Sequence, residues 1–265
     1  MEKPSYQVVP FPEMRRFASD FGWLVHNRYT MRGLLEIDVT LPRQILREHK
    51  ARAGERLSFT AFLAKCVAQA VEMDKHVHAM HNWRGDLVIF DDVDIGTLIE
   101  RETDGKTYPL AHVLRSVNKK SLREIHDEIR QVQAKPGSDE EASSLNALVK
   151  LPRFIRRGML WAVSKSPHRR KQIMGTVSLS AVGMFGSKTA WGMVPNTHSL
   201  GLIVGSIAEK PGAVEGRIEI REYLCLTIDF DHTIIDGAPA ARFTKQLAEL
   251  IESGYGLDRI IRRQK

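Results

Sequence analysis

The sequence contains few cysteines and no long hydrophobic run. Its 265 residues include two cysteines, Cys66 and Cys225, which are too few for a disulfide framework and lack CxxC spacing. Each lies in an apolar stretch, so we expect both thiols to be small buried side chains. No window of about 18 consecutive apolar residues occurs, and the N-terminus lacks the apolar segment of a signal peptide. The expected location is therefore the cytoplasm.

The sequence also lacks signatures of nucleic-acid or metal binding. A formal net charge of +7, from 39 Lys+Arg against 32 Asp+Glu, could attract nucleic acid, acidic lipid or the phosphates of a cofactor. The excess is concentrated in residues 150–171 and in the tail 258–265. No helix-turn-helix pattern, zinc-finger spacing or aromatic-glycine RNA signature accompanies it. We therefore expect no nucleic-acid partner and no metal site.

An alternation of strand-like and helix-like segments is what the sequence does contain. Strand patterns lie at 33–40, 86–90, 93–100, 175–185, 200–208 and 216–230, and helical patterns at 42–54, 57–73, 121–135, 145–167 and 238–254. The strands 86–90 and 93–100 are expected to form a hairpin or meander, and the small polar residues 137–144 a loop. Without a repeat or a long linker, the order predicts one α/β domain over residues 1–265.

Several predicted helices carry boundary signals. Ser58 or Thr60 could cap the helix at 57–73, and Ser121 with Glu124 has the spacing of a capping box. Pro152 would break the helical pattern at 145–167, and Gly254 would end the last helix.

The stretch TIDFDHTIIDGAPAARF, residues 227–243, joins an apolar strand to a helix and carries a histidine and an aspartate four residues apart. A neutral imidazole at His232, at the end of a strand, can take a proton from a thiol or hydroxyl. Asp236 could orient that imidazole or hold the loop through an arginine, and Gly237 would give the turn a permissive backbone. On spacing alone, a polar turn with an incidental histidine is the simpler interpretation.

The wider stretch LTIDFDHTIIDGAPAARFTKQLAELIE resembles the C-terminal signature, DHRxxDGA, of the catalytic domain of the acyltransferase component of 2-oxoacid dehydrogenase complexes. Chloramphenicol acetyltransferase, in the larger superfamily, keeps the same histidine and aspartate. Two further pairs match in order, DVDIGTLIE with NKKSLREIHDEI and GTVSLSAVGMFG with LGLIVGSIAEKPGAVEGRIEI. A weaker match is PFPEMRRFASDF with LEIDVT. The resemblance runs from about Pro12 to Glu252 and implies a full catalytic domain.

The resemblance implies roles for particular residues. His232 matches the general base that deprotonates the attacking thiol. Asp236 matches the aspartate that usually forms a salt bridge to an arginine, for which Arg15 and Arg16 are the candidates. Ser180 matches the hydroxyl that stabilises the tetrahedral oxyanion, a contribution of about 3 kcal/mol for one such donor.

The resemblance also implies a fold and an assembly. The family fold is a two-layer α/β sandwich, a mixed β-sheet with flanking helices, that assembles as a trimer, and trimers can build larger shells. The active site lies in a channel between subunits, with the histidine from one and the serine from its neighbour. Coenzyme A enters from one end and the acyl acceptor from the other. A monomer should then be inactive.

Three residues depart from the family pattern. Thr233 replaces the arginine that usually follows the histidine, and Ala181 replaces the asparagine that usually follows the serine. His198 stands where the family has a proline-rich stretch, and is either a new substrate contact or a neutral surface change.

Two larger departures concern whole segments. No lipoyl domain precedes the catalytic region, so no covalently attached lipoate is expected. Acyl groups would arrive on free coenzyme A, on a carrier protein, or on the lipoyl domain of another polypeptide. Residues 138–171 form an extended basic insertion, predicted to be helical, with three interpretations left open: contact with an anionic membrane surface, a cover over a channel mouth that attracts coenzyme A phosphates, or ordinary packing with a solvated basic face.

The leading functional hypothesis is an acyltransferase that moves an acyl group between a coenzyme A thioester and a thiol, hydroxyl or amine acceptor, without a covalent acyl-enzyme. The acceptor would be dihydrolipoyl on a separate protein, or a small alcohol, amine or carrier-bound thiol. The alternative from another class is a non-catalytic trimeric scaffold or interaction protein that keeps the fold alone.

Overall fold

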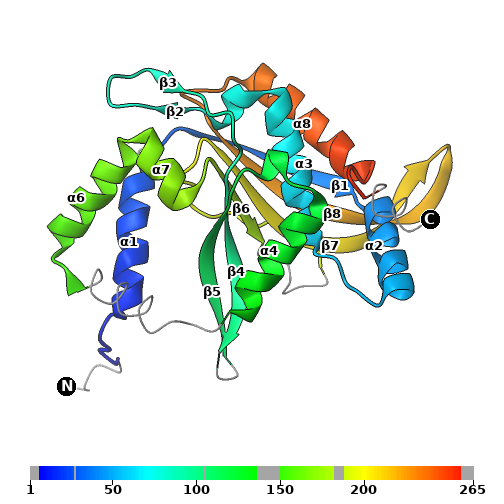
Figure 1. Cartoon of the computed structure of the whole chain (residues 1–265), viewed down its shortest axis with the longest axis horizontal. Helices are drawn as coiled ribbons and strands as arrows, with labels where there is room; N and C mark the ends of the chain where they lie inside the picture. The colour runs from blue at the N-terminus through cyan, green and yellow to red at the C-terminus, as the bar shows by residue number, and fades with distance from the viewer. Residues whose placement is uncertain (1–5, 27, 104–105, 136–149, 182–187, 258–265) are drawn as a thin grey trace.

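The computed structural model describes residues 6–26, 28–103, 106–135, 150–181 and 188–257 (Figure 1). Along the chain these residues form α1 (Glu13–Val25), β1 (Thr30–Asp38), α2 (Thr40–Ala53), α3 (Phe59–Met73), β2 (Met80–His81), β3 (Leu87–Val88), β4 (Ile95–Thr103), β5 (Lys106–Leu114), α4 (Leu122–Ala134), α6 (Arg153–Ser164), α7 (Pro167–Met174), β6 (Val177–Ala181), β7 (Leu200–Val214), β8 (Arg217–Asp231) and α8 (Gly237–Glu252). Short 3-10 turns lie at Lys75–His78 and Val117–Lys119. The predicted loop at 137–144 lies outside the described residues.

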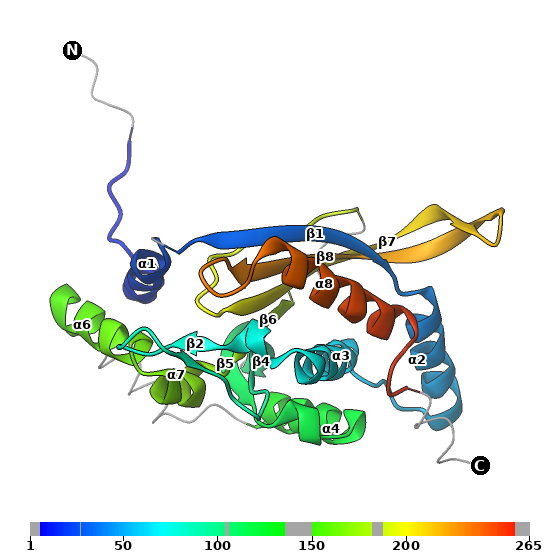
Figure 2. The same ribbon diagram turned by 90° about the horizontal axis from the view of Figure 1, so that it is seen from above.

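Six strands form the main sheet in the order β1-β8-β7-β6-β4-β5. β6 runs parallel to both β4 and β7, whereas the other neighbouring strands pair antiparallel. Helix α8 packs against β1 and α4 against β4, and Figure 2 shows α8 and α3 on one side of β1 and β8. The mixed sheet flanked by helices that the sequence predicted is confirmed.

Helix α3 lies at the centre of the core. It is apolar on nearly all sides, as expected for a helix buried between a sheet and other helices. The Ser58 hydroxyl accepts a hydrogen bond from Ala61 N at 3.2 Å, so Ser58 is the cap that begins the helix. Cys66 of α3 and Cys225 of β8 are 0% and 1% exposed, which confirms that both thiols are buried. Burial also raises the pKa of the Cys66 thiol.

The capping box predicted for the helix at 121–135 is confirmed, because Ser121 and Glu124 bond each other's backbone N–H at the start of α4. At the other end of the chain, Gly254 directly follows the C-cap of α8 and has a φ of 68°. This left-handed conformation favours glycine and ends the helix as predicted.

The predicted hairpin between residues 86–90 and 93–100 is wrong. β3 pairs with β2, and β4 pairs with β5 on one side and β6 on the other. The Asp94 carboxylate explains the difference, because it accepts from Ser116 N at 2.8 Å and from Arg115 Nη1 at 2.9 Å. These bonds fix the segment before β4 to the end of β5 and direct β4 away from β3.

Helix α6 belongs to the basic insertion and packs on α1, with Arg156 and Arg157 turned toward α1 and Arg153 exposed. Asp20 of α1 is 1% exposed and accepts from Arg156 Nε at 2.7 Å and from Arg157 Nε at 3.2 Å. Phe154 and Trp161, which the sequence would place on the buried face, are 76% and 54% exposed. A fully solvated basic face is therefore wrong for Arg156, because a buried carboxylate attracts it. The membrane contact and the cover over a channel mouth stay predictions.

None of the helices in the described part of the chain is both long enough and apolar enough to cross a membrane. The predicted cytoplasmic location stays a prediction.

Candidate functional site

The His232 loop is held by backbone bonds on both sides. Asp231 N donates to Ser199 O, and His232 N donates to Tyr29 O, each at 2.8 Å. The His232 Nδ1 atom lies 3.2 Å from Ile235 O, and the side chain is 53% exposed. Because a carbonyl oxygen can only accept, the neutral ring carries its proton on Nδ1. This leaves Nε2 with a lone pair, which is the nitrogen that a general base needs.

Asp236 lies at the N-cap of α8 and makes no side-chain capping bond. Its Oδ1 atom is 3.8 Å from His232 Nδ1, and its side chain is 87% exposed. Among the described residues of one chain, neither Arg15 nor Arg16 forms an ion pair with Asp236, so the predicted pairing stays a prediction. Both arginines are exposed near the start of α1, about 15 Å along the helix from its end beside β1.

Gly237 is the first residue of α8, and its φ is not in the left-handed region. The permissive backbone expected at this position is therefore not required by the loop that the structure shows.

The ion pair at this site involves a different aspartate and a different arginine. Asp231 Oδ2 lies 3.8 Å from Arg28 Nη1, and Asp231 is 8% exposed. The other oxygen, Oδ1, accepts from the backbone N and the hydroxyl of Thr233 at 3.1 and 2.6 Å. Thr233 thus holds the aspartate that precedes the histidine. Nothing in the sequence indicated that Asp231 pairs with Arg28.

Ser180 does not meet His232 within one chain. It is half-buried near the end of β6 and pairs with Ile203, which in turn pairs with Thr227 of β8. Ser180 is separated from Asp231 by two strand spacings and by four residues along β8, a distance of about 17 Å. The residues that follow Ala181 in the matched GMFG motif, 182–187, lie outside the described residues.

His198 is buried rather than exposed. It is 6% exposed, its Nε2 lies 3.0 Å from Met174 O, and its Nδ1 lies 3.2 Å from Thr197 Oγ1. Burial, and then the nearby Arg170, lower the pKa of His198 to about 3. With both nitrogens engaged in the protein, His198 is a neutral structural side chain, so neither the substrate contact nor the surface change describes it.

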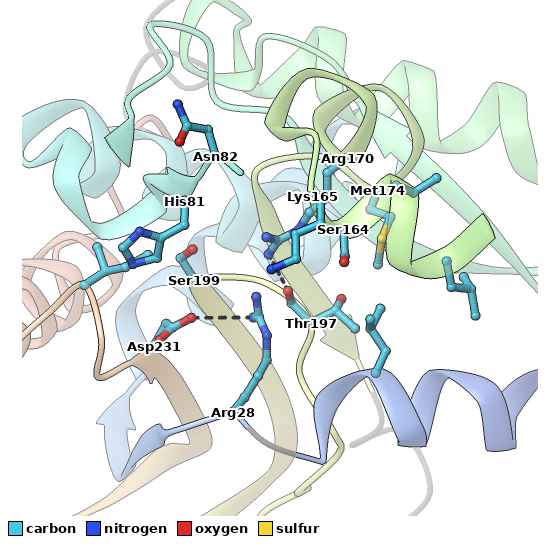
Figure 3. Close-up of a pocket in the computed structure, with 14 residues that line it drawn as sticks. Arg28, His81, Asn82, Ser164, Lys165, Arg170, Met174, Thr197, Ser199 and Asp231 are labelled. Atoms are coloured by element: carbon cyan, nitrogen blue, oxygen red, sulfur yellow. Dashed lines mark hydrogen bonds and ion pairs between the residues drawn. The ribbon is translucent and has the colours of Figure 1, made fainter. Parts of the chain in front are cut away.

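A cavity of about 190 Å³ lies beside the His232 loop, and we call it the Arg170 cavity (Figure 3). Its wall is shared by α1, α6, α7, the β2 strand and the ends of β7 and β8, through Leu24, Arg28, His81, Asn82, Leu160, Val163, Ser164, Lys165, Arg170, Met174, Thr197, Ser199, Asp231 and Ile234. Figure 3 shows Arg28 and Asp231 pointing toward each other. Burial, and then Arg28, lower the pKa of Arg170 to about 9.

A second cavity, of about 370 Å³, is lined by Ala181 at the end of β6, and we call it the Ala181 cavity. Its wall comes from α2, α3, α4, β4 and the end of β6, and it includes Arg43, Arg47, Lys50, Arg56 and Arg130. The hydroxyl of Thr97 also lines this cavity and is buried without a hydrogen-bond partner among the described residues. The cavity therefore combines positive charge with an unused polar group.

One acidic group in the described residues has the spacing of a metal site, with ligand atoms of Glu55, His126 and Asp127 within 4.8 Å of one another. His126 Nδ1 accepts from Ser58 N at 3.0 Å, so the ring proton lies on Nε2, the nitrogen that faces Glu55 at 3.5 Å. A protonated nitrogen cannot ligate a metal, and Arg123 already pairs with Glu55. We interpret the group as an ion-pair network.

Comparison with known proteins identifies the family. Residues 23–141 and 163–257 match the model of the 2-oxoacid dehydrogenases acyltransferase (catalytic domain). The chain belongs to this family. The unmatched residues 142–162 fall inside the basic insertion at 138–171.

Two curated members of the acyltransferase family are similar in sequence. The lipoamide acyltransferase component of the branched-chain alpha-keto acid dehydrogenase complex of Bacillus subtilis is 26% identical over 226 residues, which cover 83% of this chain and 46% of that protein. The dihydrolipoyllysine-residue succinyltransferase component of the 2-oxoglutarate dehydrogenase complex of Staphylococcus saprophyticus is 26% identical over 228 residues, 86% of this chain and 46% of that protein. The chain spans about half the length of the curated relatives it matches.

Solved structures share the fold of this family member. The cubic core of the pyruvate dehydrogenase multienzyme complex matches with a TM-score of 0.69 and 21% identity, over 96% of this chain and 95% of that one. The dihydrolipoamide acetyltransferase of Azotobacter vinelandii matches with a TM-score of 0.69 and 22% identity, over 96% and 95%. Chloramphenicol acetyltransferase is more distant, with a TM-score of 0.50 and 17% identity over 89% and 94%. The expected chloramphenicol acetyltransferase-like fold is confirmed.

Proposed function

We propose that the chain is an acyltransferase that moves an acyl group between a coenzyme A thioester and a thiol, hydroxyl or amine acceptor. The observation that carries the proposal is the His232 imidazole, whose Nδ1 faces Ile235 O and whose Nε2 is left as a base. Family membership supplies the reaction class, and the loop geometry supplies a residue able to begin it.

In the proposed mechanism, His232 Nε2 takes the proton of the acceptor as the acceptor attacks the thioester carbonyl carbon. The Ser180 hydroxyl donates a hydrogen bond to the resulting oxyanion, which is worth about 3 kcal/mol. The carbon–sulfur bond then breaks, and the coenzyme A thiolate takes the proton back from the imidazolium. No acyl-enzyme forms. The roles of a serine, a histidine and an asparagine four positions after it were investigated in the Azotobacter enzyme, which supports the same positions here.

We propose that the working unit is a homotrimer, which could build into a larger assembly such as the cubic core of a relative. The separation of about 17 Å between Ser180 and Asp231 supports this proposal, because one chain alone cannot bring the hydroxyl and the imidazole to one carbonyl group. A neighbouring copy would supply the missing partner, as the family resemblance implies.

The Ala181 cavity is our candidate for the phosphate-bearing part of coenzyme A. Five cationic side chains line it directly beside the end of β6, where Ser180 lies. A polyphosphate drawn there would bring the thioester arm toward the oxyanion donor. The basic helix α6 is less suited to this role, because Arg156 and Arg157 already bind Asp20.

The acceptor remains a choice between two chemistries. Dihydrolipoyl on another polypeptide agrees with the names of the curated relatives, and a small alcohol, amine or carrier-bound thiol is the other possibility. An acceptor panel that includes dihydrolipoamide, a free lipoyl domain, and small amines and alcohols separates them.

A thiol-release assay tests the proposed function. Purified protein is given a panel of acyl-coenzyme A donors, and His232→Ala is compared with His76→Ala, which changes an exposed histidine on a 3-10 turn. We expect His232→Ala to lose about 10²- to 10⁴-fold in rate and His76→Ala to match the wild type. Equal rates for the wild type and His232→Ala would instead support the non-catalytic scaffold.

A further inference from the structure

The Arg170 cavity holds more positive than negative charge. Arg28, Arg170 and the exposed Lys165 line it, against a single carboxylate, that of Asp231. That carboxylate is already engaged, because one oxygen accepts from Thr233 and the other faces Arg28. The cavity therefore has uncompensated positive charge at its wall.

Arg170 is the most unusual member of the wall. It is 5% exposed, and among the described residues its guanidinium forms no ion pair and donates one hydrogen bond, to Thr197 O. A guanidinium has five N–H donors, so most of them are left for another acceptor. Asp231 attracts this charge only in part, because it also faces Arg28. Burying an arginine that is not fully compensated costs several kcal/mol, which an anion bound in the cavity would offset.

The size and position of the cavity limit what that anion can be. About 190 Å³ is less than a typical pocket for a drug-sized ligand, so a nucleotide does not fit, whereas an acyl chain of a few carbons does. Asp231 and Ile234, on either side of His232, both line the cavity. A group held there lies next to the proposed base.

We propose that the Arg170 cavity binds a carboxylate carried by the substrate, with Arg170 as its main ligand. This inference rests on the proposed acyl transfer for its place in catalysis, whereas binding of a free dicarboxylate can be measured without any turnover. A planar carboxylate matches the fork of an arginine and can accept two parallel bonds from it. The carboxylate could be part of the acyl group or of the acceptor.

A thermal-shift titration tests binding directly. Wild type, Arg170→Gln and the matched control Arg169→Gln, an exposed arginine on the same helix, are titrated with succinate and with neutral succinamide at constant ionic strength. We expect succinate, and not succinamide, to raise the melting temperature of wild type and Arg169→Gln, and neither to affect Arg170→Gln. The proposal is overturned if succinate has no effect on the wild type, or if Arg170→Gln responds as the control does.

A variant that leaves every charge in place guards against misfolding of Arg170→Gln. Ser164→Phe fills the cavity from α6, where the Ser164 hydroxyl donates to Trp161 O of the same helix at 2.7 Å. We expect it to lose the succinate response as well. A response retained in Ser164→Phe would place succinate elsewhere, and stabilisation of the wild type by inorganic phosphate but not succinate would assign a different anion.

Kinetics distinguish the two sources of the carboxylate. Succinyl-coenzyme A is compared with butyryl-coenzyme A, and dihydrolipoate with dihydrolipoamide, which in each pair differ chiefly in the carboxylate. We expect at least a tenfold preference in kcat/KM for one carboxylate, lost in Arg170→Gln and kept in Arg169→Gln. A preference in the first pair assigns the carboxylate to the acyl group, and one in the second pair to the acceptor. A preference in neither pair overturns the role in substrate selection.

Discussion

The Arg170 cavity and the Ala181 cavity are both positively charged, but their charges differ in exposure. In the Arg170 cavity the main cation is 5% exposed and the side chain of Arg28 is 24% exposed. In the Ala181 cavity the side chains of Arg43 and Arg47 are 37% and 56% exposed, and both also face Glu222. A buried charge is little screened by salt and selects one small anion, whereas exposed charges attract any polyanion and lose that attraction as salt rises. The Ala181 cavity therefore suits the phosphates of coenzyme A, and the Arg170 cavity suits a single substrate carboxylate.

The largest expected effect tests whether the two cavities serve one active site shared between copies. His232→Ala and Ser180→Ala should each lose about 10²-fold or more in kcat. If each site takes its histidine from one chain and its serine from the next, co-refolding equal amounts of the two variants restores about a quarter of the wild-type activity by random assembly. The measurement is acyl transfer by the mixture, with each variant refolded alone as control. A mixture no more active than its parts would show that each chain carries its own complete site.

A smaller expected effect is a loss of stability in the wall of the Arg170 cavity that does not extend to the wall of the Ala181 cavity. Asp20→Asn removes the buried carboxylate that accepts from Arg156 and Arg157, so docking of α6 on α1 should lose about 3 kcal/mol. Amide hydrogens of α6 should then exchange faster, while those of α2 and β4 keep their protection. Asp91→Asn is the control, because it removes an exposed ion pair with Lys75. Faster exchange in α2 and β4 as well as in α6 would mean that the change acts on global stability instead.

Salt should weaken the attraction of acyl-coenzyme A to the Ala181 cavity but have little effect on anion binding in the Arg170 cavity. Removing two cations from the Ala181 cavity, with Lys50→Gln and Arg130→Gln together, should raise KM for acyl-coenzyme A several-fold at low ionic strength, with kcat little changed. At high salt the difference from wild type should shrink. Lys245→Gln with Arg217→Gln removes the same charge away from both cavities and is the control. A KM defect that persists at high salt would mean that these side chains bind the donor by direct contacts rather than by charge attraction.

The sequence predicted the parts of this protein that depend on local pattern. The Ser58 and Ser121 caps were predicted because a helix needs such side chains at its start. For His232 the local pattern alone favoured a polar turn, and the role of base came from the resemblance of the wider stretch to DHRxxDGA. Helix α1 was missed because its N-cap is Pro12, which offers no side-chain signal.

Contacts between distant segments could not be predicted in the same way. The pair of Arg28 with Asp231 joins residues near opposite ends of the chain, and nothing in either segment indicates the other. The inverted face of α6 has the same origin, because it depends on a single carboxylate in α1, Asp20, that periodicity within α6 cannot reveal. The Arg170 cavity is made entirely of such contacts, so its charge imbalance is visible only in the folded chain.

The smallest expected effect is on the pH dependence of stability, and it concerns His198, which lies between two residues that line the Arg170 cavity. Burial lowers the pKa of His198 to about 3 from the ordinary value of 6.5. Between these two values the unfolded chain binds a proton that the folded chain does not, so the free energy of unfolding falls as pH falls. From about pH 7 to about pH 5.5 this one residue should remove about 1 kcal/mol, and His198→Gln should show a correspondingly smaller loss over the same interval. Denaturant unfolding of both proteins at the two pH values measures this loss. An equal loss in wild type and His198→Gln would mean that His198 takes up its proton in the folded state as well.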